Sequence, residues 1–435
     1  MAWKKATVEV IPSAKRLIRS LRDVGYDFVH AVADLVDNSV TANASRVDIE
    51  MRFDGRNSWV RAADNGTGMS GTTITEAMRF GTEREYDPDE LGRFGLGLKT
   101  ASLSQCFRLT VASRADRRSR RIEVRQWDLA HVEETNRWEI IKVPARERPG
   151  RLVEPLQNGT GTVVLWEVLD RVLGYKIAWG AMAQAGFFKL AGDLDQHLGM
   201  VFHRFLSGEA RRKKKLSITI NGTTVDPWDP FASDERATVR FEEKQFEVTS
   251  DDGPGLVAYT AYILPAQDRF SSLKAFNRYS GPGKWNYQQG FYIYRADRMI
   301  QSGGWCRMRT RDEHTKLARV ALDFWPDLDS AFELNVAKAR VTLPADLRTK
   351  VGPHIEQLAK HARKKYSEGG PGRPGGPQGL SGTRRGGLSH GAPRNTHIGE
   401  AIDAAAGRAD ETKALKEIKR ALRDDNPEIA DDIGW

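Results

Sequence analysis

The sequence predicts a mixed α/β fold in two domains, followed by a flexible linker and a C-terminal helix. Three observations support this. Helix-like and strand-like segments follow one another from Tyr26 to Leu165, and a helical stretch, Ile177–Leu206, separates them from a second group of strands. Residues Ser367–Arg394 are rich in glycine and proline and lack an apolar pattern, which is typical of a linker.

Composition and charge limit the class of protein. The 435 residues suffice for two or three domains with separate cores. No apolar run approaches the roughly 20 residues of a membrane-spanning helix, and the N-terminus lacks the apolar core of a signal peptide. Cys106 and Cys306 are the only cysteines, which excludes a disulfide framework and a CxxC metal site. We therefore expect a cytoplasmic protein that does not enter a membrane.

The first chemical signal lies in a predicted helix, Tyr26–Ala42. Its apolar residues recur at helical spacing, and Asp34 and Asn38, four residues apart, share one face. A carboxylate can orient and deprotonate water, and an amide oxygen is a hard ligand suited to Mg²⁺. An amphipathic helix with solvated polar residues would give the same pattern, so the interpretation depends on the motifs that follow.

A predicted hairpin leads to the second signal. Val47–Phe53 alternates as a strand, Asp54-Gly55 marks a turn, and Ser58–Ala63 returns to deliver Asp64 at a strand end. Gly66 and Gly68 follow, which allows the backbone to approach a ligand closely. A buried aspartate here can accept a hydrogen bond from an exocyclic amine such as that of adenine. The DxGxG pattern also suits an ordinary turn.

A second glycine-rich segment, Gly92–Thr100, follows an acidic loop and leads into a predicted helix, Leu98–Leu103. Backbone N–H groups at a helix start suit phosphates. The segment is neither a Walker loop nor a dinucleotide fingerprint, because Leu98 precedes Lys99 and no strand leads directly into it. Further strands are predicted over Phe107–Ala112, Arg121–Asp128 and Trp138–Val143. A glycine turn then leads into another strand, Gly159–Leu165.

The order and spacing of these motifs over Tyr26–Leu165 resemble the GHKL ATPases, which include gyrase, the ninety-kilodalton heat-shock chaperones, histidine kinases and MutL. The resemblance implies a Bergerat-type sandwich that holds ATP between helices and a mixed sheet. It implies that Asp34 is the catalytic base, that Asn38 is the Mg²⁺ ligand and that Asp64 anchors adenine. The remaining nucleotide-binding residues implied by this resemblance are Gly66, Gly68, Met69, Gly92, Phe94, Gly95, Leu96, Gly97, Lys99, Thr100 and Thr162.

The chain departs from the family at one catalytic position. Hydrolytic members carry glutamate where this chain has Asp34, whose side chain is one methylene shorter. Asp37 is no obvious substitute, because it lies one residue from Asn38, which turns its side chain by about 100° from that of Asn38. The sequence is therefore compatible both with slow ATP hydrolysis and with ATP binding without hydrolysis.

The second half begins with a predicted hairpin, Leu216–Ile220 and Val225, that the turn Asn221-Gly222 closes. It looks like the second domain of MORC-type GHKL proteins, chiefly over Gly290–Ile300. This implies a ribosomal-protein-like α/β transducer that supplies a lysine to the γ-phosphate. Lys338 is the best match, with an exposed lysine at a strand end as the plain alternative and Arg340 as another candidate. Asp195-Gln-His197 lacks the other elements of a MutL-type metal motif, and we interpret it as part of a helix.

The net charge of +9 favours an anionic partner. Dense basic runs occur at Ser113–Arg121 and at Arg211, Arg212, Lys213, Lys214 and Lys215. Contact with a duplex backbone is favoured over base stacking, because no aromatic residues are interleaved with these runs. Solvated loops would explain each run equally well.

These observations predict five segments: an ATP-binding domain (1–172), a helical connector (173–214), a transducer (215–366), a linker (367–395) and a C-terminal helix with an acidic tail (396–435). Thr396–Asp425 carries a thin apolar stripe, which suits either a docking helix for a partner or a frayed tail.

We expect an ATP- and Mg²⁺-dependent, dimerising, MORC-like ATPase that acts on double-stranded DNA in genome defence, including antiviral defence, or in DNA management. A chaperone-like or scaffold switch acting on proteins is the alternative. A histidine kinase is disfavoured, because no phosphoacceptor helix precedes the domain.

Overall fold

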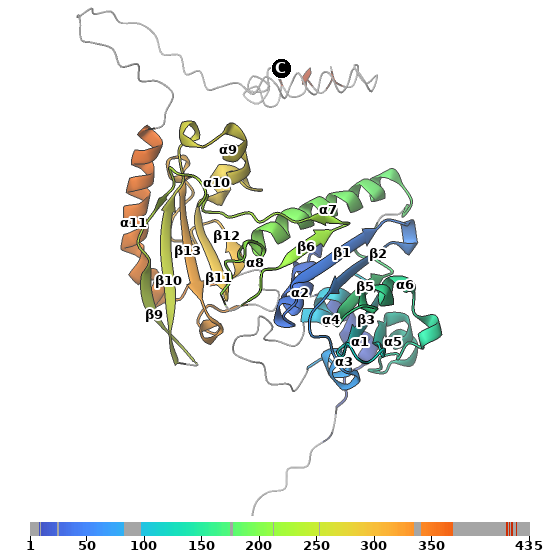
Figure 1. The fold of residues 1–435 in the computed structure, drawn as a ribbon. Helices are drawn as coiled ribbons and strands as arrows, with labels where there is room; N and C mark the ends of the chain where they lie inside the picture. The colour runs from blue at the N-terminus through green and yellow to red at the C-terminus, as the bar shows by residue number, and fades with distance from the viewer. Residues whose placement is uncertain are drawn as a thin grey trace, which may run out of the picture. The chain divides into compact units, whose positions relative to one another are not determined.

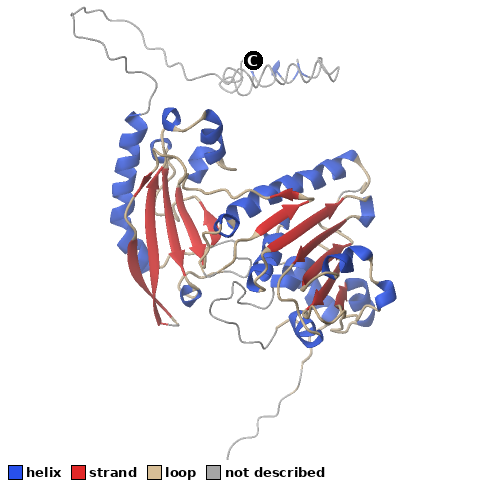
Figure 2. Ribbon diagram, in the orientation of Figure 1, coloured by secondary structure: helices blue, strands red, loops and turns tan. Residues whose placement is uncertain are grey.

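The computed structural model describes residues 8, 10–23, 26–81, 97–174, 177–211, 213–251, 253–334 and 341–368, together with Leu415, Glu417, Lys419, Arg420 and Arg423. The chain divides into one compact unit, Met1–Pro371, and a second unit, Gly372–Trp435. The first unit is an α+β structure with two mixed sheets (Figures 1 and 2). In the second unit the five described residues are helical, and the rest of the predicted C-terminal helix lies outside the described residues.

The first sheet has seven strands in the order β4-β3-β5-β2-β1-β6-β7. All neighbours are antiparallel except β1 and β6. Their bounds are Arg46–Arg52 (β1), Trp59–Asp64 (β2), Arg108–Arg114 (β3), Glu123–Asp128 (β4), Gly161–Glu167 (β5), Ser217–Ile220 (β6) and Thr223–Thr224 (β7).

Helices cover both faces of this sheet (Figure 1). The main core lies on one face, where side chains of α1 (Ala14–Arg22), α2 (Phe28–Thr41), α4 (Gly97–Leu103) and α7 (Ala181–Val201) pack together. A smaller apolar cluster on the other face includes Leu152 and Leu156 from the short helices α6 (Gly150–Val153) and η3 (Glu154–Leu156). Shorter helices complete this region: η1 (Gly55–Asn57), α3 (Gly71–Ala77), α5 (Leu129–Thr135) and η2 (Ala145–Glu147).

The second sheet begins after the connector helices α7 and α8 (His203–Ser207). Its order is β12-β11-β13-β10-β8, and β9 also pairs with β10; only β11 and β13 are parallel. The bounds are Val239–Arg240 (β8), Lys244–Ser250 (β9), Gly253–Ile263 (β10), Gly290–Arg295 (β11), Arg298–Ser302 (β12) and Ala318–Phe324 (β13).

The long helix α11 (Ala345–Glu368) packs on this second sheet through Leu347, Val351 and Ile355. Aromatic side chains such as Phe231, Tyr262 and Tyr292 form another part of the same core. The remaining short helices are η4 (Gln267–Arg269), α9 (Leu273–Tyr279), α10 (Lys284–Gln288), η5 (Glu313–Thr315) and η6 (Pro326–Leu328).

Two parts of the sequence interpretation need correction. The predicted strand Trp138–Val143 was wrong: only Ile141 forms an isolated bridge, with Gln126, and the Trp138 ring packs against Phe80 and Trp127 instead. The hairpin near Leu216, which we placed in the second domain, belongs to the first sheet, because β6 pairs with β1. A four-residue strand has no sequence feature that specifies which sheet edge it joins.

The turn that closes this hairpin has the conformation that its sequence predicts. Asn221 and Gly222 both have positive φ, 49° and 83°, as a type I′ turn requires. The Asn221 side-chain oxygen also accepts a hydrogen bond from the Met51 backbone N–H at 2.8 Å, which links the turn to β1.

This turn gives a stability prediction. Asn221→Gly keeps the backbone conformation but removes the side-chain hydrogen bond, so it should lower the free energy of unfolding by about 1 kcal/mol. Asn221→Ala also places a less tolerant residue at positive φ and should cost a further ~1 kcal/mol. Urea titrations of the two variants test this order, and equal losses would contradict the contribution of the backbone.

Candidate functional site

The site begins on α2, which starts where Asp27 caps the helix by accepting the His30 N–H. Asp34 is 2% exposed and lies in the core side of this helix, whereas Asn38, one turn later, is exposed. The Tyr26 hydroxyl donates a hydrogen bond to Asp34 Oδ2 at 2.9 Å. Burial, together with the nearby Asp34 charge, raises the pKa of Tyr26, so the phenol stays protonated and acts as the donor.

Strand register assembles the second part of the site. Asp64 at the end of β2 lies opposite Thr162 on β5, and Thr162 lies opposite Ser113 on β3. The Asp64 carboxylate accepts hydrogen bonds from the backbone N–H groups of Gly66 at 2.8 Å and Thr162 at 3.2 Å. It also accepts one from the Ser39 hydroxyl at 3.2 Å.

Burial raises the pKa of the Asp64 carboxyl above its ordinary value, although these three hydrogen bonds favour the charged form. A buried acceptor of this kind suits recognition of a neutral amine donor. The neighbouring Ser113 hydroxyl donates to the Gly161 carbonyl and accepts from the Met69 N–H, so Met69 is held beside the same strand ends.

The two glycines of the DxGxG motif also allow the chain to approach itself closely. A Cβ on Gly68, whose φ is +69°, would lie 2.1 Å from the Arg114 carbonyl oxygen, and one on Gly66 would lie 2.7 Å from that of Ala42. These glycines are therefore required by close approach of the protein's own backbone.

A cavity of about 710 Å³ opens beside Met69. Its lining includes Glu76 and Arg79 from the region of α3, and Arg125 and Lys142 from the region of β4 and beyond. Polar and charged side chains thus border a cavity that lies next to Met69, at the strand ends that carry Asp64 and Ser113.

The start of α4 supplies a third part. A Cβ on Gly97 would lie 3.3 Å from Asp34 Oδ2, so the backbone at this helix start passes close to that carboxylate. The buried Thr100 hydroxyl has no hydrogen-bond partner within the described part of the chain, so a polar atom at this helix start is left unsatisfied. Gly92, Phe94, Gly95 and Leu96 lie outside the described residues, and so do Lys338 and Arg340.

The side chain of Lys99, another predicted nucleotide-binding residue, is buried on α4. It is 2% exposed, and its ammonium donates to the Ala77 carbonyl at 3.0 Å. Burial lowers the Lys99 pKa to about 8.

Of the predicted basic run, Arg211 is held by other side chains. It forms an ion pair with Asp297 at 3.2 Å, and its guanidinium lies 4.9 Å from the centre of the Trp325 ring. Lys214 and Lys215 are exposed and Lys213 is half-buried, while Arg212 lies outside the described residues.

Sequence reasoning missed three residues of the site: Tyr26, Ser39 and Ser113. Ser39 follows Asn38 directly and lies one turn after Leu35, so helical geometry offered a signal for it. Tyr26 and Ser113 become relevant only through tertiary contacts. Among the described residues, no group of three or more His, Cys, Asp or Glu side chains could hold a metal ion, and no helix is long and apolar enough to cross a membrane.

The buried Lys99 predicts how stability depends on pH. Its pKa of about 8 in the folded protein lies below the roughly 10.4 of an unfolded chain. Below pH 8 both states are protonated and the cost of burying the charge is fully present. Between pH 8 and about 10.4 the folded protein releases the proton first, so this cost, at most about 3 kcal/mol, is relieved as pH rises.

Lys99→Met should therefore lose this rise in stability relative to the unaltered protein. Urea unfolding of both proteins at pH 7.5 and at pH 10 measures the difference. An equal rise in both proteins would contradict the lowered pKa of Lys99.

The comparisons with known proteins match the part of the chain that carries this candidate site. Residues 26–161 match the family model described as histidine kinase-, DNA gyrase B- and HSP90-like ATPase. The chain is 36% identical over 78 residues to ATPase MORC2 of Homo sapiens and to ATPase MORC2B of Mus musculus, covering 17% of this chain and 8% of each relative. It is 32% identical over 113 residues to the DNA mismatch repair protein MutL of Fervidobacterium nodosum, covering 24% of this chain and 19% of that protein. The matched stretches are thus less than a fifth of these relatives' lengths.

Proposed function

Because residues 26–161 form a GHKL-type ATPase domain distantly similar to the ATPase regions of MORC2 and MutL, we propose that this chain is a MORC-like, ATP-dependent switch. The family implies ATP hydrolysis. The observation that carries the proposal is the convergence of Asp34, Asp64 and the start of α4 around α2 and the ends of β2 and β5.

In this proposal the two ends of ATP occupy two parts of the site, adenine at Asp64 and the phosphates at the start of α4. Asp64 accepts the exocyclic amine of adenine, with Thr162 and Met69 beside it. The Thr100 hydroxyl, which has no partner among the described residues, and the backbone at Gly97 serve the phosphate end. The resulting architecture is a Bergerat-type sandwich followed by a transducer domain, with Lys338 or Arg340 as the group that reaches the γ-phosphate.

Mg²⁺ fits through Asn38, whose exposed amide lies one turn beyond Asp34. An ion held by one protein oxygen together with phosphate and water is the usual mode for Mg²⁺, and it requires no cluster of carboxylates. When bound, the ion neutralises phosphate charge. Asp34 orients and deprotonates the attacking water, and the Tyr26 hydroxyl fixes the position of its carboxylate.

The predicted chemistry depends on Asp34. Asp34→Asn should reduce turnover by about 10²–10⁴-fold while ATP binding stays nearly intact, because the amide is isosteric but cannot accept the proton. Asp34→Glu should keep or raise the rate. Phosphate release and nucleotide binding, measured side by side, test this, and unchanged turnover in Asp34→Asn would place the base elsewhere.

We propose double-stranded DNA as the partner of an ATP-dependent homodimer in the cytoplasm, in genome defence or DNA management. The net charge of +9 and the exposed Lys214 and Lys215 support an anionic partner. Within the basic run, Lys213–Lys215 are the better candidates for phosphate contact, since Arg211 pairs with Asp297.

Neutralising Lys213, Lys214 and Lys215 to glutamine should weaken duplex binding for all sequences. The slope of log affinity against log salt should fall by up to about 0.9 for each phosphate that the protein no longer neutralises. Titrations of one duplex at several salt concentrations measure this. The same substitutions at Lys360, Lys364 and Lys365 on α11 are a matched control, and an unaltered slope would mean that Lys213–Lys215 are simply solvated.

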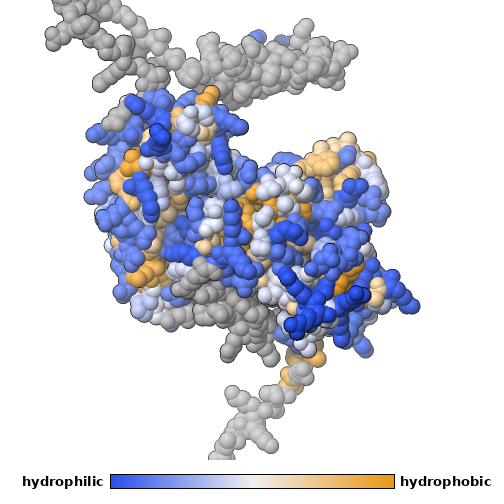
Figure 3. All heavy atoms as spheres, viewed as in Figure 1, coloured by the Kyte–Doolittle hydropathy of each residue, from blue (hydrophilic) through white to orange (hydrophobic). Residues whose placement is uncertain are grey.

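An exposed apolar area favours the alternative, a scaffold or chaperone-like switch that acts on proteins. Ile177, Trp179 and Met182 at the start of α7 are 72%, 61% and 79% exposed, and Figure 3 shows apolar side chains gathered there. Exposed apolar patches mark protein-binding surfaces. Salt-sensitive duplex binding distinguishes the two candidates.

A further inference from the structure

The hairpin formed by β11 and β12 carries charged residues that contact three other parts of the protein. Arg295 pairs with Asp329 at 2.6 Å, and both side chains are almost fully buried. Asp297 binds Arg204 and Arg211, and Arg298 binds Asp37 on α2. Neighbouring residues of one tight turn therefore contact the connector and the helix that carries Asp34 and Asn38.

The contact with α2 is a buried ion pair between the two sheet-bearing regions. Arg298 Nε donates to Asp37 Oδ1 at 2.8 Å, and the two side chains are 2% and 1% exposed. The Arg298 guanidinium also lies 5.9 Å from the centre of the Phe202 ring, where α7 ends. Because Asp37 lies one turn beyond Asp34 and directly precedes Asn38, fixing Asp37 limits how α2 can rotate.

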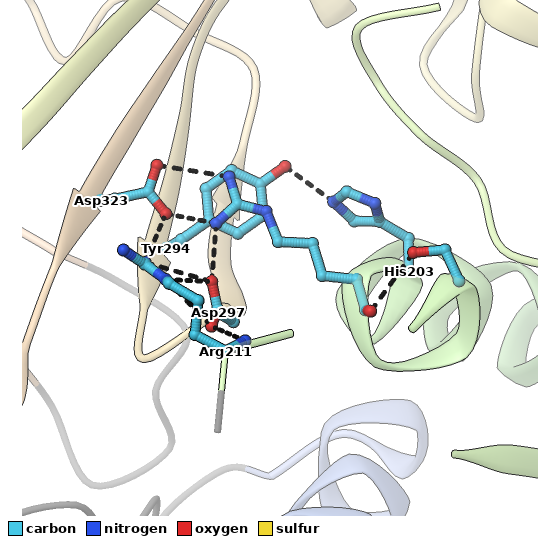
Figure 4. A network of polar contacts seen from close by, with 7 residues as sticks. His203, Arg211, Tyr294, Asp297 and Asp323 are labelled. Carbon is cyan, nitrogen blue, oxygen red and sulfur yellow. Dashed lines mark hydrogen bonds and ion pairs between the residues drawn. The ribbon is translucent and has the colours of Figure 1, made fainter. Parts of the chain in front are cut away.

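The contact with the connector is made by the adjacent residue. Asp297, 3% exposed, accepts hydrogen bonds from Arg204 at 3.0 Å and from the Arg211 backbone N–H at 2.8 Å (Figure 4). Arg204 also binds Asp323 on β13 and lies 3.6 Å from the centre of the Tyr294 ring. The Arg211 end of the basic run is thus fixed to the turn that presents Arg298.

The turn itself is under conformational strain. Ala296 and Asp297 have φ of 47° and 67° between the paired residues Arg295 and Arg298, as in a type I′ turn. At these two positions a type I′ turn favours asparagine or aspartate followed by glycine, whereas this chain has Ala296 followed by Asp297. The side-chain contacts of Asp297 therefore help to hold a conformation that its sequence does not favour.

We propose that the β11–β12 turn couples the basic run to the nucleotide-binding helix, with Arg298 as a positioning residue for α2 and Asp297 as the clamp on Arg211. When a duplex binds at Lys213–Lys215, it displaces Arg211 relative to Asp297. The adjacent Arg298 carries this displacement to Asp37. ATP turnover then responds to duplex. This inference rests on the proposed ATPase and DNA-binding functions, and it adds the residues that connect them.

The positioning role is tested with Arg298→Lys, which keeps the positive charge but loses the geometry of the guanidinium. We expect kcat for ATP to fall about tenfold, because a small misplacement of catalytic groups is costly, while KM stays within about threefold. Hydrogen exchange of residues 28–41 should become faster. Arg319→Lys is the matched control, since Arg319 is equally buried on β13 but donates to the carbonyls of Pro230 and Tyr279.

Unchanged kcat and unchanged exchange in Arg298→Lys would overturn the positioning role, as would equal effects in Arg319→Lys. The exchange measurement does not require turnover. If the unaltered protein hydrolyses no ATP, the proposed function fails, and faster exchange of α2 in Arg298→Lys alone still supports the positioning role.

The coupling is tested with Asp297→Gly, which removes the carboxylate while supplying a residue that favours positive φ. Ala296→Gly relaxes the same turn and keeps the carboxylate. With a duplex of about 30 base pairs as probe, turnover of the unaltered protein and of Ala296→Gly should change severalfold on binding, and Asp297→Gly should lose most of that change.

A full response in Asp297→Gly, or a bound duplex that leaves the turnover of the unaltered protein unchanged, would overturn the coupling. If the duplex does not bind at all, the proposed partner is wrong and the coupling falls with it. Duplex binding and turnover are therefore measured on the same samples.

Discussion

The arrangement of the molecule depends on the buried ion pair between Asp37 and Arg298. Two charges removed from water are tolerated only when they meet with good geometry, so either residue without the other would be strongly unfavourable. The pair joins α2, which packs on the first sheet, to β12 at one edge of the second. Because it lies one turn from Asp34, the second sheet contributes directly to the environment of the proposed catalytic helix.

A second constraint is the strand register of the first sheet. Side chains of a strand alternate between faces, so a one-residue slip would turn Thr162 away from Asp64. The antiparallel pairing of β5 with both β2 and β3 places Asp64, Thr162 and Ser113 in one row. Gly161, whose Cβ would lie 2.0 Å from the Asp64 carbonyl oxygen, allows the strands to meet there. The part of the site that we propose for adenine is thus specified by backbone pairing between strands that are far apart in the sequence.

The sequence could predict what short-range patterns encode. Helical periodicity identified α2, and alternation and turn residues identified the hairpins β1–β2 and β6–β7. It could not predict that β6 joins the first sheet, because register partners across long distances leave no local signal. For the same reason Asp37 was considered only as a substitute for Asp34, although Arg298, 261 residues later, lies against it. Tyr26 was likewise found only through its contact with Asp34.

The shorter carboxylate of Asp34 is accompanied by two features of its surroundings. The Tyr26 hydroxyl holds Oδ2, which restricts the carboxylate to one orientation. Gly97 lets the backbone at the start of α4 approach the same oxygen, where a Cβ would lie only 3.3 Å away. A side chain at position 97 would compress this contact or push α4 outwards. For the proposed role of Asp34 as catalytic base, this close approach of the helix start would recover, from the other side of the site, part of the reach that the missing methylene removes.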